Sequence, residues 1–141
     1  MRFPIVLLQL VFSLIYLTSP VQGQIAAPGQ ELYDKAERYF IYGRDVEDRY
    51  EKTRYMDYAI VLFKNYLDLY PNGTNAANAH YHMGFSEQSI GRIDEAERIF
   101  KNILSRYRRG NIVGLAANKL ALLSYTEQDW KNAAKYFDQS A

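Results

Sequence analysis

His80 and His82 are the residues best suited to metal binding or acid–base chemistry, and they are the only histidines in the chain. On a helix, residues i and i+2 point about 200° apart, so the two imidazoles cannot bind one metal ion together. Glu87 follows at a spacing that does not complete a site. We therefore predict one packing histidine, one surface histidine and no metal site.

Two clusters of charged residues are the next candidates. Carboxylates at 45–48 could form an acid–base pair, but we favour a solvated face. Arginines around position 108 could bind an acidic partner or lipid headgroups, but we favour a role at a helix C-terminus, where positive charge complements the helix dipole. The residues concerned are Asp45, Glu47, Asp48, Arg106, Arg108 and Arg109.

Motifs for catalysis are missing from the sequence. The chain has no cysteine, so thiolate nucleophiles and cysteine metal ligands are excluded. It also has no glycine-rich phosphate loop and no serine in an elbow motif. We predict that the protein is not an enzyme and uses no cofactor.

Composition restricts the class of partner. The chain has 141 residues, 48% of them hydrophobic and 23% charged, which fits one globular domain. Its 17 basic and 16 acidic residues give a net charge of +1. Because this balance provides no basic footprint, we predict no nucleic-acid binding and membrane contact only through a partner protein.

The first 23 residues resemble a cleavable signal peptide. Arg2 precedes an apolar stretch over 5–17, and the small residues Val21 and Gly23 suit the cleavage subsites. An uncleaved anchor is the alternative, but 13 apolar residues span only about 20 Å as a helix, which is shorter than the roughly 30 Å hydrocarbon core. Cleavage before Gln24 would leave 118 of the 141 residues.

The mature chain superimposes on itself at a shift of 37 residues. We predict a flexible lead-in over 24–29 and a helical repeat domain over 30–141. Its repeats cover about 30–73, 74–110 and 111–141, of which the first contains an insertion of about ten residues and the last is incomplete. The clearest matches are Ala59, Ala96 and Ala133, together with Phe63, Phe100 and Phe137.

Each repeat has the pattern of two helices. Apolar residues recur at helical spacing over 75–90 and over 94–107, and no segment alternates with period two, so we predict an all-α fold. Thr74, Asn111 and Asp94 are the expected N-caps. Residues 43–56 could form either a longer helix or a charged loop. Because one helix pair cannot bury its apolar face, the pairs must stack on one another.

The recurring alanines and phenylalanines have packing roles in this interpretation. A small side chain lets two helices cross closely, so we expect the repeated alanines at the crossing with a partner helix near Gly84 or Ala121. The repeated phenylalanines should fill the space one turn further along. The last repeat lacks a polar capping helix, so its outer face could mediate self-association.

A non-core stripe on the first helix of each repeat is a candidate peptide groove. Its amides could hold backbone groups and its rings could supply apolar contact area. The alternative is that these side chains only pack against neighbouring helices. The stripe consists of Asn78, Tyr81, Phe85 and Gln88 in one repeat and of Leu115, Asn118, Leu122 and Tyr125 in the next.

The repeat resembles a known family. The Ala-x3-Phe pattern with a small residue upstream, such as Gly84 ahead of Ala96, is similar to the tetratricopeptide repeat. The wording of 58–84 and 94–100 resembles exported bacterial repeat proteins of the YbgF and BamD type. That resemblance implies a solenoid of stacked antiparallel helix pairs that binds proteins in the cell envelope, near the Tol–Pal system or the outer-membrane β-barrel assembly machinery.

Together these features predict an exported, non-enzymatic scaffold that binds a protein or peptide partner in a bacterial periplasm. One alternative is an architectural subunit that self-associates through the uncapped last repeat. Another is an accessory domain within a larger repeat protein.

Overall fold

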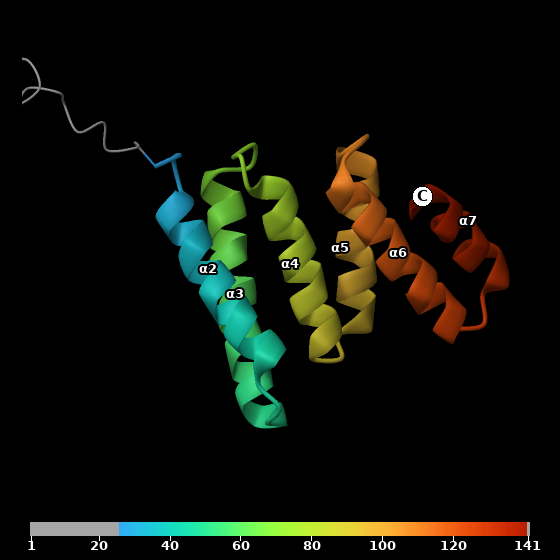
Figure 1. Cartoon of the computed structure of the whole chain (residues 1–141), viewed down its shortest axis with the longest axis horizontal. Helices are drawn as coiled ribbons and strands as arrows, with labels where there is room; N and C mark the ends of the chain where they lie inside the picture. Colours follow the sequence, from blue (N-terminus) through green and yellow to red (C-terminus); the bar gives the residue numbers. More distant parts are fainter. Residues whose placement is uncertain (1–25, 141) are drawn as a thin grey trace, which may run out of the picture.

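The computed structural model describes residues 26–140, which form six α-helices and no strand (Figure 1). The predicted all-α fold is therefore confirmed for this part of the chain. The predicted signal peptide, residues 1–23, lies outside the described residues. The helices are α2 (Gln30–Asp45), α3 (Arg49–Leu69), α4 (Ala76–Ser89), α5 (Ile93–Arg106), α6 (Asn111–Thr126) and α7 (Trp130–Ser140).

The helices follow one another along the long axis of the molecule, with α2 and α3 at one end and α7 at the other (Figure 1). Each packs mainly against the helices before and after it in the chain, and smaller contacts join α2 to α4 and α4 to α6. We refer to α2–α3, α4–α5 and α6–α7 as the first, second and third helix pairs. No helix between residues 26 and 140 combines the length and apolar character needed to cross a bilayer.

The predicted insertion in the first repeat lengthens its two helices. Tyr33 contacts Phe63 as Tyr81 contacts Phe100, with ring centroids 5.8 and 5.9 Å apart, yet the first two residues are 30 positions apart and the second two are 19. The segment between the two rings is therefore 11 residues longer in the first pair. α2 and α3 have 16 and 21 residues, nine more in total than the 14 each of α4 and α5. Of the two alternatives, the longer helix is correct.

The expected N-caps at Thr74, Asn111 and Asp94 are wrong. Asn75 and Gly110 precede α4 and α6, and α5 begins at Ile93, so Asp94 lies within its first turn. The reason at α5 is a tight turn in which the Arg92 N–H donates to the Glu87 carbonyl oxygen, so the next helix begins at once. Asp94 still stabilises the N-terminal end of α5 through its charge.

The repeated core positions are buried in the first two pairs. Phe63 and Phe100 are both 0% exposed, and Ala59, Ala96 and Ala133 are also buried. Phe137 departs from this pattern at 41% exposed. The prediction that Phe137 fills the core is wrong, because no helix in the described part of the chain follows α7 to cover its outer side.

Gly84 permits the close approach of α4 and α5. A Cβ at this position would lie 2.8 Å from the Phe100 Cε1 atom and 3.0 Å from the Ile99 Cγ2 atom, closer than carbon atoms pack. Gly84 therefore contacts Phe100. This residue lies one helical turn after Ala96, which was expected at the crossing.

Candidate protein-binding surfaces

The structure divides the predicted groove into a half-buried and an exposed part. On α4, Asn78, Tyr81, Phe85 and Gln88 are all half-buried. Tyr81 packs against the core formed by α5 and α6, and its ring lies 5.9 Å from that of Phe100. This part of the stripe therefore serves largely as an interface between helices, as the packing alternative predicted.

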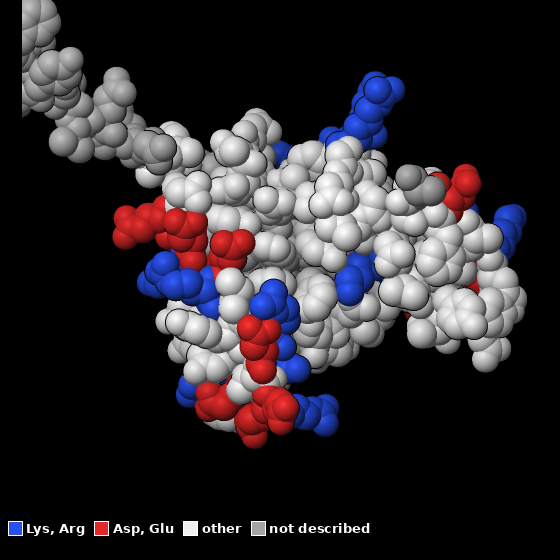
Figure 2. Space-filling view, viewed as in Figure 1, with Lys and Arg blue, Asp and Glu red and all other residues white. Residues whose placement is uncertain are grey.

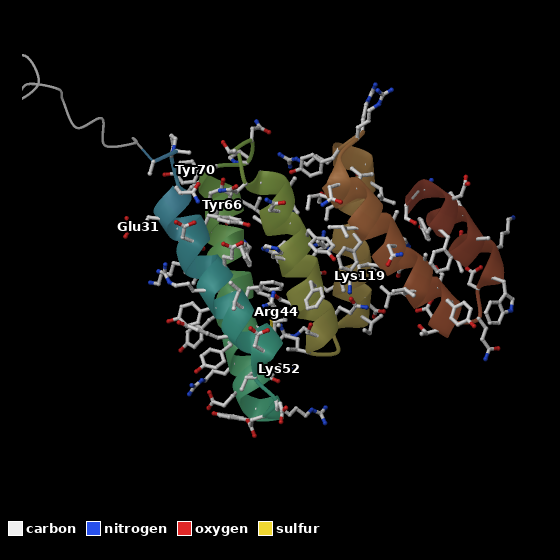
Figure 3. The ribbon with its side chains drawn as sticks, viewed as in Figure 1. Glu31, Arg44, Lys52, Tyr66, Tyr70 and Lys119 are labelled. Carbon is white, nitrogen blue, oxygen red and sulfur yellow. The ribbon has the colours of Figure 1, made fainter. Side chains whose placement is uncertain are left out.

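Phe85 has neighbours on both sides. Its ring lies 5.5 Å from Phe40 of α2 in an edge-on contact. The Lys119 ammonium of α6 lies 4.4 Å from the Phe85 ring centroid, and Figure 3 labels Lys119 beside α4. Burial lowers the Lys119 pKa below its ordinary value, because the interior disfavours its charge.

The equivalent residues of α6 are exposed. Asn118, Leu122 and Tyr125 lie on the surface together with Leu115. The Tyr125 ring meets Trp130 of α7 edge-on, with ring centroids 5.1 Å apart. We call the large exposed apolar side chains of the third pair the C-terminal aromatic face: Leu115, Leu122, Tyr125, Trp130 and Phe137.

A second exposed surface lies on the first helix pair and was not among the predicted sites. Tyr39 and Tyr42 on α2 meet Tyr55 and Tyr58 on α3, and we call these four residues the tyrosine surface. Ring centroids are 5.4 Å apart for Tyr39 and Tyr58 and 5.8 Å apart for Tyr42 and Tyr55. The Arg54 guanidinium lies 5.3 Å from the Tyr55 ring centroid.

The tyrosine surface is open to a partner. Tyr42 and Tyr58 are 55% and 54% exposed, and Val61 and Tyr50 lie exposed on the same helix as Tyr58. Charged side chains gather over this first helix pair, whereas the end of the molecule at α6 and α7 is largely uncharged in the same view (Figure 2). On the face drawn in Figure 2, charged side chains thus lie mainly over the first helix pair.

The two histidines contact different neighbours. The His82 ring stacks on Phe40 with centroids 4.4 Å apart, and its Nδ1 atom is buried without a hydrogen-bond partner. Burial, with a smaller contribution from the charge of Arg44, lowers the His82 pKa to about 4. The ring centroids of His80 and Tyr107 lie 6.2 Å apart. Burial, together with the charge of Arg106, lowers the His80 pKa as well. Among residues 26–140, no three His, Asp or Glu side chains are grouped to hold a metal ion.

The acidic cluster has structural contacts. Asp45, Glu47 and Asp48 are exposed, as expected for a solvated face. Asp45 pairs with Arg44, and the Asp48 carboxylate accepts a hydrogen bond from the Glu51 N–H at 2.8 Å, which caps α3.

The arginine cluster is divided between two roles. Arg106 donates hydrogen bonds to the Pro71 carbonyl oxygen at 2.6 Å and to Asn72 Oδ1 at 3.2 Å, joining the ends of α5 and α3. Arg108 and Arg109 line an open hollow of about 530 Å³ at the start of α6. The cluster is therefore more than a solvated helix end, since one member links two helix pairs.

A buried carboxylate links the first two pairs. Glu87 is 6% exposed and pairs with Arg92 at 3.2 Å, and Arg92 also pairs with Asp57 of α3 at 2.8 Å. Burial raises the Glu87 pKa above its ordinary value, and Arg92 opposes this shift. The ion pair with Arg92 thus offsets part of the cost of burying the Glu87 carboxylate.

Comparison with known proteins yields no significant similarity to a family model, to a curated protein or to a solved structure.

Proposed function

We propose that the protein is an exported, non-enzymatic scaffold that binds other proteins in the bacterial cell envelope, specifically in the periplasm. In this proposal the helix pairs form a tetratricopeptide-like solenoid of stacked antiparallel pairs. The 37-residue repeat and the resemblance to YbgF-type and BamD-type proteins support it. The same resemblance favours a partner near the Tol–Pal system or the outer-membrane assembly machinery.

The observation that carries the proposal is the tyrosine surface on the first helix pair. Tyrosine supplies a large contact area with few rotatable bonds and a hydroxyl for hydrogen bonding. Tyr42 and Tyr58 present such area to solvent, with Arg54 beside them. Tyrosine and arginine are the residue types enriched at the energetic centres of protein interfaces.

The ring contacts also favour binding by reducing its entropic cost. Tyr39 touches both Tyr42 and Tyr58, with ring centroids 6.5 and 5.4 Å apart, so the rings are held before a partner arrives. A side chain that is already ordered loses less conformational entropy on association. The expected partner is therefore a protein segment that lays apolar and hydrogen-bonding groups along the tyrosine surface.

Site-specific photo-crosslinking in producing cells tests the proposal. A photoreactive phenylalanine analogue at Tyr58 should yield adducts of defined mass with an envelope protein. The control position is Asn102, which is exposed on α5 and distant in sequence from the tyrosine surface. Adducts at Tyr58 and not at Asn102 support the proposal, and the absence of adducts at both Tyr42 and Tyr58 contradicts it.

The second candidate function is architectural self-association. The C-terminal aromatic face favours it, because five large apolar side chains of the third helix pair are exposed and two of them, Tyr125 and Trp130, contact each other.

A further inference from the structure

The C-terminal aromatic face occupies positions that are covered elsewhere in the same chain. Met56 and Trp130 lie two 37-residue steps apart and are therefore equivalent, yet Met56 is 0% exposed and Trp130 is 58% exposed. Phe63 and Phe137 are likewise equivalent, yet Phe63 is 0% exposed and Phe137 is 41% exposed. In the first pair, α4 packs against α3, and the His82 ring of α4 lies 5.5 Å from the Phe63 ring between centroids. The exposed face is therefore the side on which each earlier pair receives the next one.

The same relation holds on α6. Leu122 is equivalent to Phe85, over which Lys119 of the following pair lies at 4.4 Å. Five side chains that are about half exposed, each with roughly 200 Å² of surface, would remove roughly 500 Å² from water per copy. Two copies together would bury roughly 1,000 Å², which is at the lower limit for a specific interface.

We propose that this face binds the same face of a second copy of the chain, with the two α7 helices antiparallel about a twofold axis. Lys131 and Asp138 are both exposed and lie two helical turns apart on one side of α7. When antiparallel helices are centred between Ala134 and Lys135, Lys131 of each copy faces Asp138 of the other. Parallel helices would instead place like charges together.

The centre of this contact suits close approach. Ala134 is exposed and lies midway between Lys131 and Asp138, so the helix axes can approach closely there. Trp130 and Phe137 lie on either side of it and supply the apolar contact. An isologous contact of this kind closes at two copies.

Head-to-tail stacking is disfavoured by the opposite end of the molecule. The outer side of α2 carries Glu31, Lys35 and Arg38, all exposed. Stacking another copy there would remove these charges from water, which is costly. The twofold pairing leaves both tyrosine surfaces at the far ends, so the dimer would present two copies of the proposed binding site and gain avidity for a multivalent partner.

Sedimentation of the full chain tests the pairing. We expect a reversible dimer with a dissociation constant in the micromolar range. Lys131→Asp should weaken it at least tenfold, and adding Asp138→Lys to that variant should restore it, because the opposite charges then face each other again. A monomer at about 100 μM overturns the proposal. A dimer unaffected by Lys131→Asp, or not restored by the double variant, overturns it as well.

Cross-linking fixes the geometry independently of affinity. The chain has no cysteine, so a single cysteine substitution introduces the only thiol. Ala134→Cys should form a disulfide-linked dimer under mild oxidation, because the two positions lie beside the twofold axis. The matched control, Lys35→Cys on the exposed side of α2, should remain monomeric. Cross-linking of the Lys35→Cys variant but not of the Ala134→Cys variant would overturn the proposal, while the test of the tyrosine surface would stand unaffected.

Discussion

Replacing Phe100 and Phe137 by alanine, one at a time, compares the same substitution at two equivalent positions, of which the first is buried and the second is partly exposed. Phe100 is 0% exposed, its ring lies 5.9 Å from Tyr81, and the chain at Gly84 is pressed against it. Removing a fully buried phenylalanine ring costs about 3 to 5 kcal/mol. Phe137 is 41% exposed, so its loss should cost about 1 to 2 kcal/mol.

These free energies translate into separable melting temperatures. With about 2.1 cal/mol/K per residue over the described part of the chain, 1 kcal/mol corresponds to about 4 °C. Phe100→Ala should then lower the melting temperature by about 12 to 20 °C, and Phe137→Ala by about 4 to 8 °C.

The assay is thermal and urea unfolding followed by circular dichroism at protein concentrations too low for self-association. Fluorescence of Trp130, the only tryptophan, reports separately on the third helix pair. Equal losses of unfolding free energy for the two variants would refute the difference in burial between Phe100 and Phe137. A loss below about 1 kcal/mol for Phe100→Ala would refute its burial.

Two further predictions concern His82 and Gln128. The His82 pKa is about 4 in the folded protein, below the ordinary value of 6.5, so the unfolded chain binds more protons between these values and stability must fall as the pH drops through that window. The loss should reach about 3 kcal/mol near pH 4; His82→Phe should remove this component in urea titrations at several pH values, and identical pH profiles for both proteins would contradict it. Gln128 has φ 61° at the position equivalent to Gly91, which has φ 85°. Gln128→Gly should raise the free energy of unfolding by about 0.5 to 1 kcal/mol, because glycine adopts this conformation without steric cost, and an unchanged or lower unfolding midpoint would count against that reasoning.

The sequence was sufficient for the helices and for most of their packing. Alanine and phenylalanine recurring at 37 residues marked buried positions in the first two pairs, because both residue types are needed where helices cross. The N-caps could not be read in the same way. Gly91 adopts a left-handed conformation that ends one helix and begins the next within two residues, which leaves no position for Asp94 to cap.

The candidate groove was predictable only in part. Phe85 and Leu122 occupy equivalent positions on their helices, but Lys119 of the following pair lies over Phe85, whereas Leu122 is exposed. The difference depends on the neighbouring helix and not on local sequence. Alanine at Tyr81 and Phe85 would therefore also perturb packing, so it cannot serve as a clean test of binding.

The 37-residue repeat did not predict the tyrosine surface, because the additional residues of the first pair interrupt the repeat there. Tyr39 and Tyr42 are three residues apart, as are Tyr55 and Tyr58, and the two spacings place each pair of rings on one side of its helix. This equal spacing in two adjacent helices was the available signal. The spacing alone does not show that the tyrosines of α2 meet those of α3, because this contact depends on the length of both helices.

The most direct test of the protein-binding proposal is the affinity of the cross-linked partner for the wild-type chain and for a Tyr42→Ala/Tyr58→Ala variant, measured by titration calorimetry. Both tyrosines are more than half exposed, so the variant should keep its helicity. We predict an affinity at least tenfold lower for the variant, with Asn102→Ala unchanged as the control. Equal affinities for the wild-type protein and the double variant would contradict the assignment of this surface to binding.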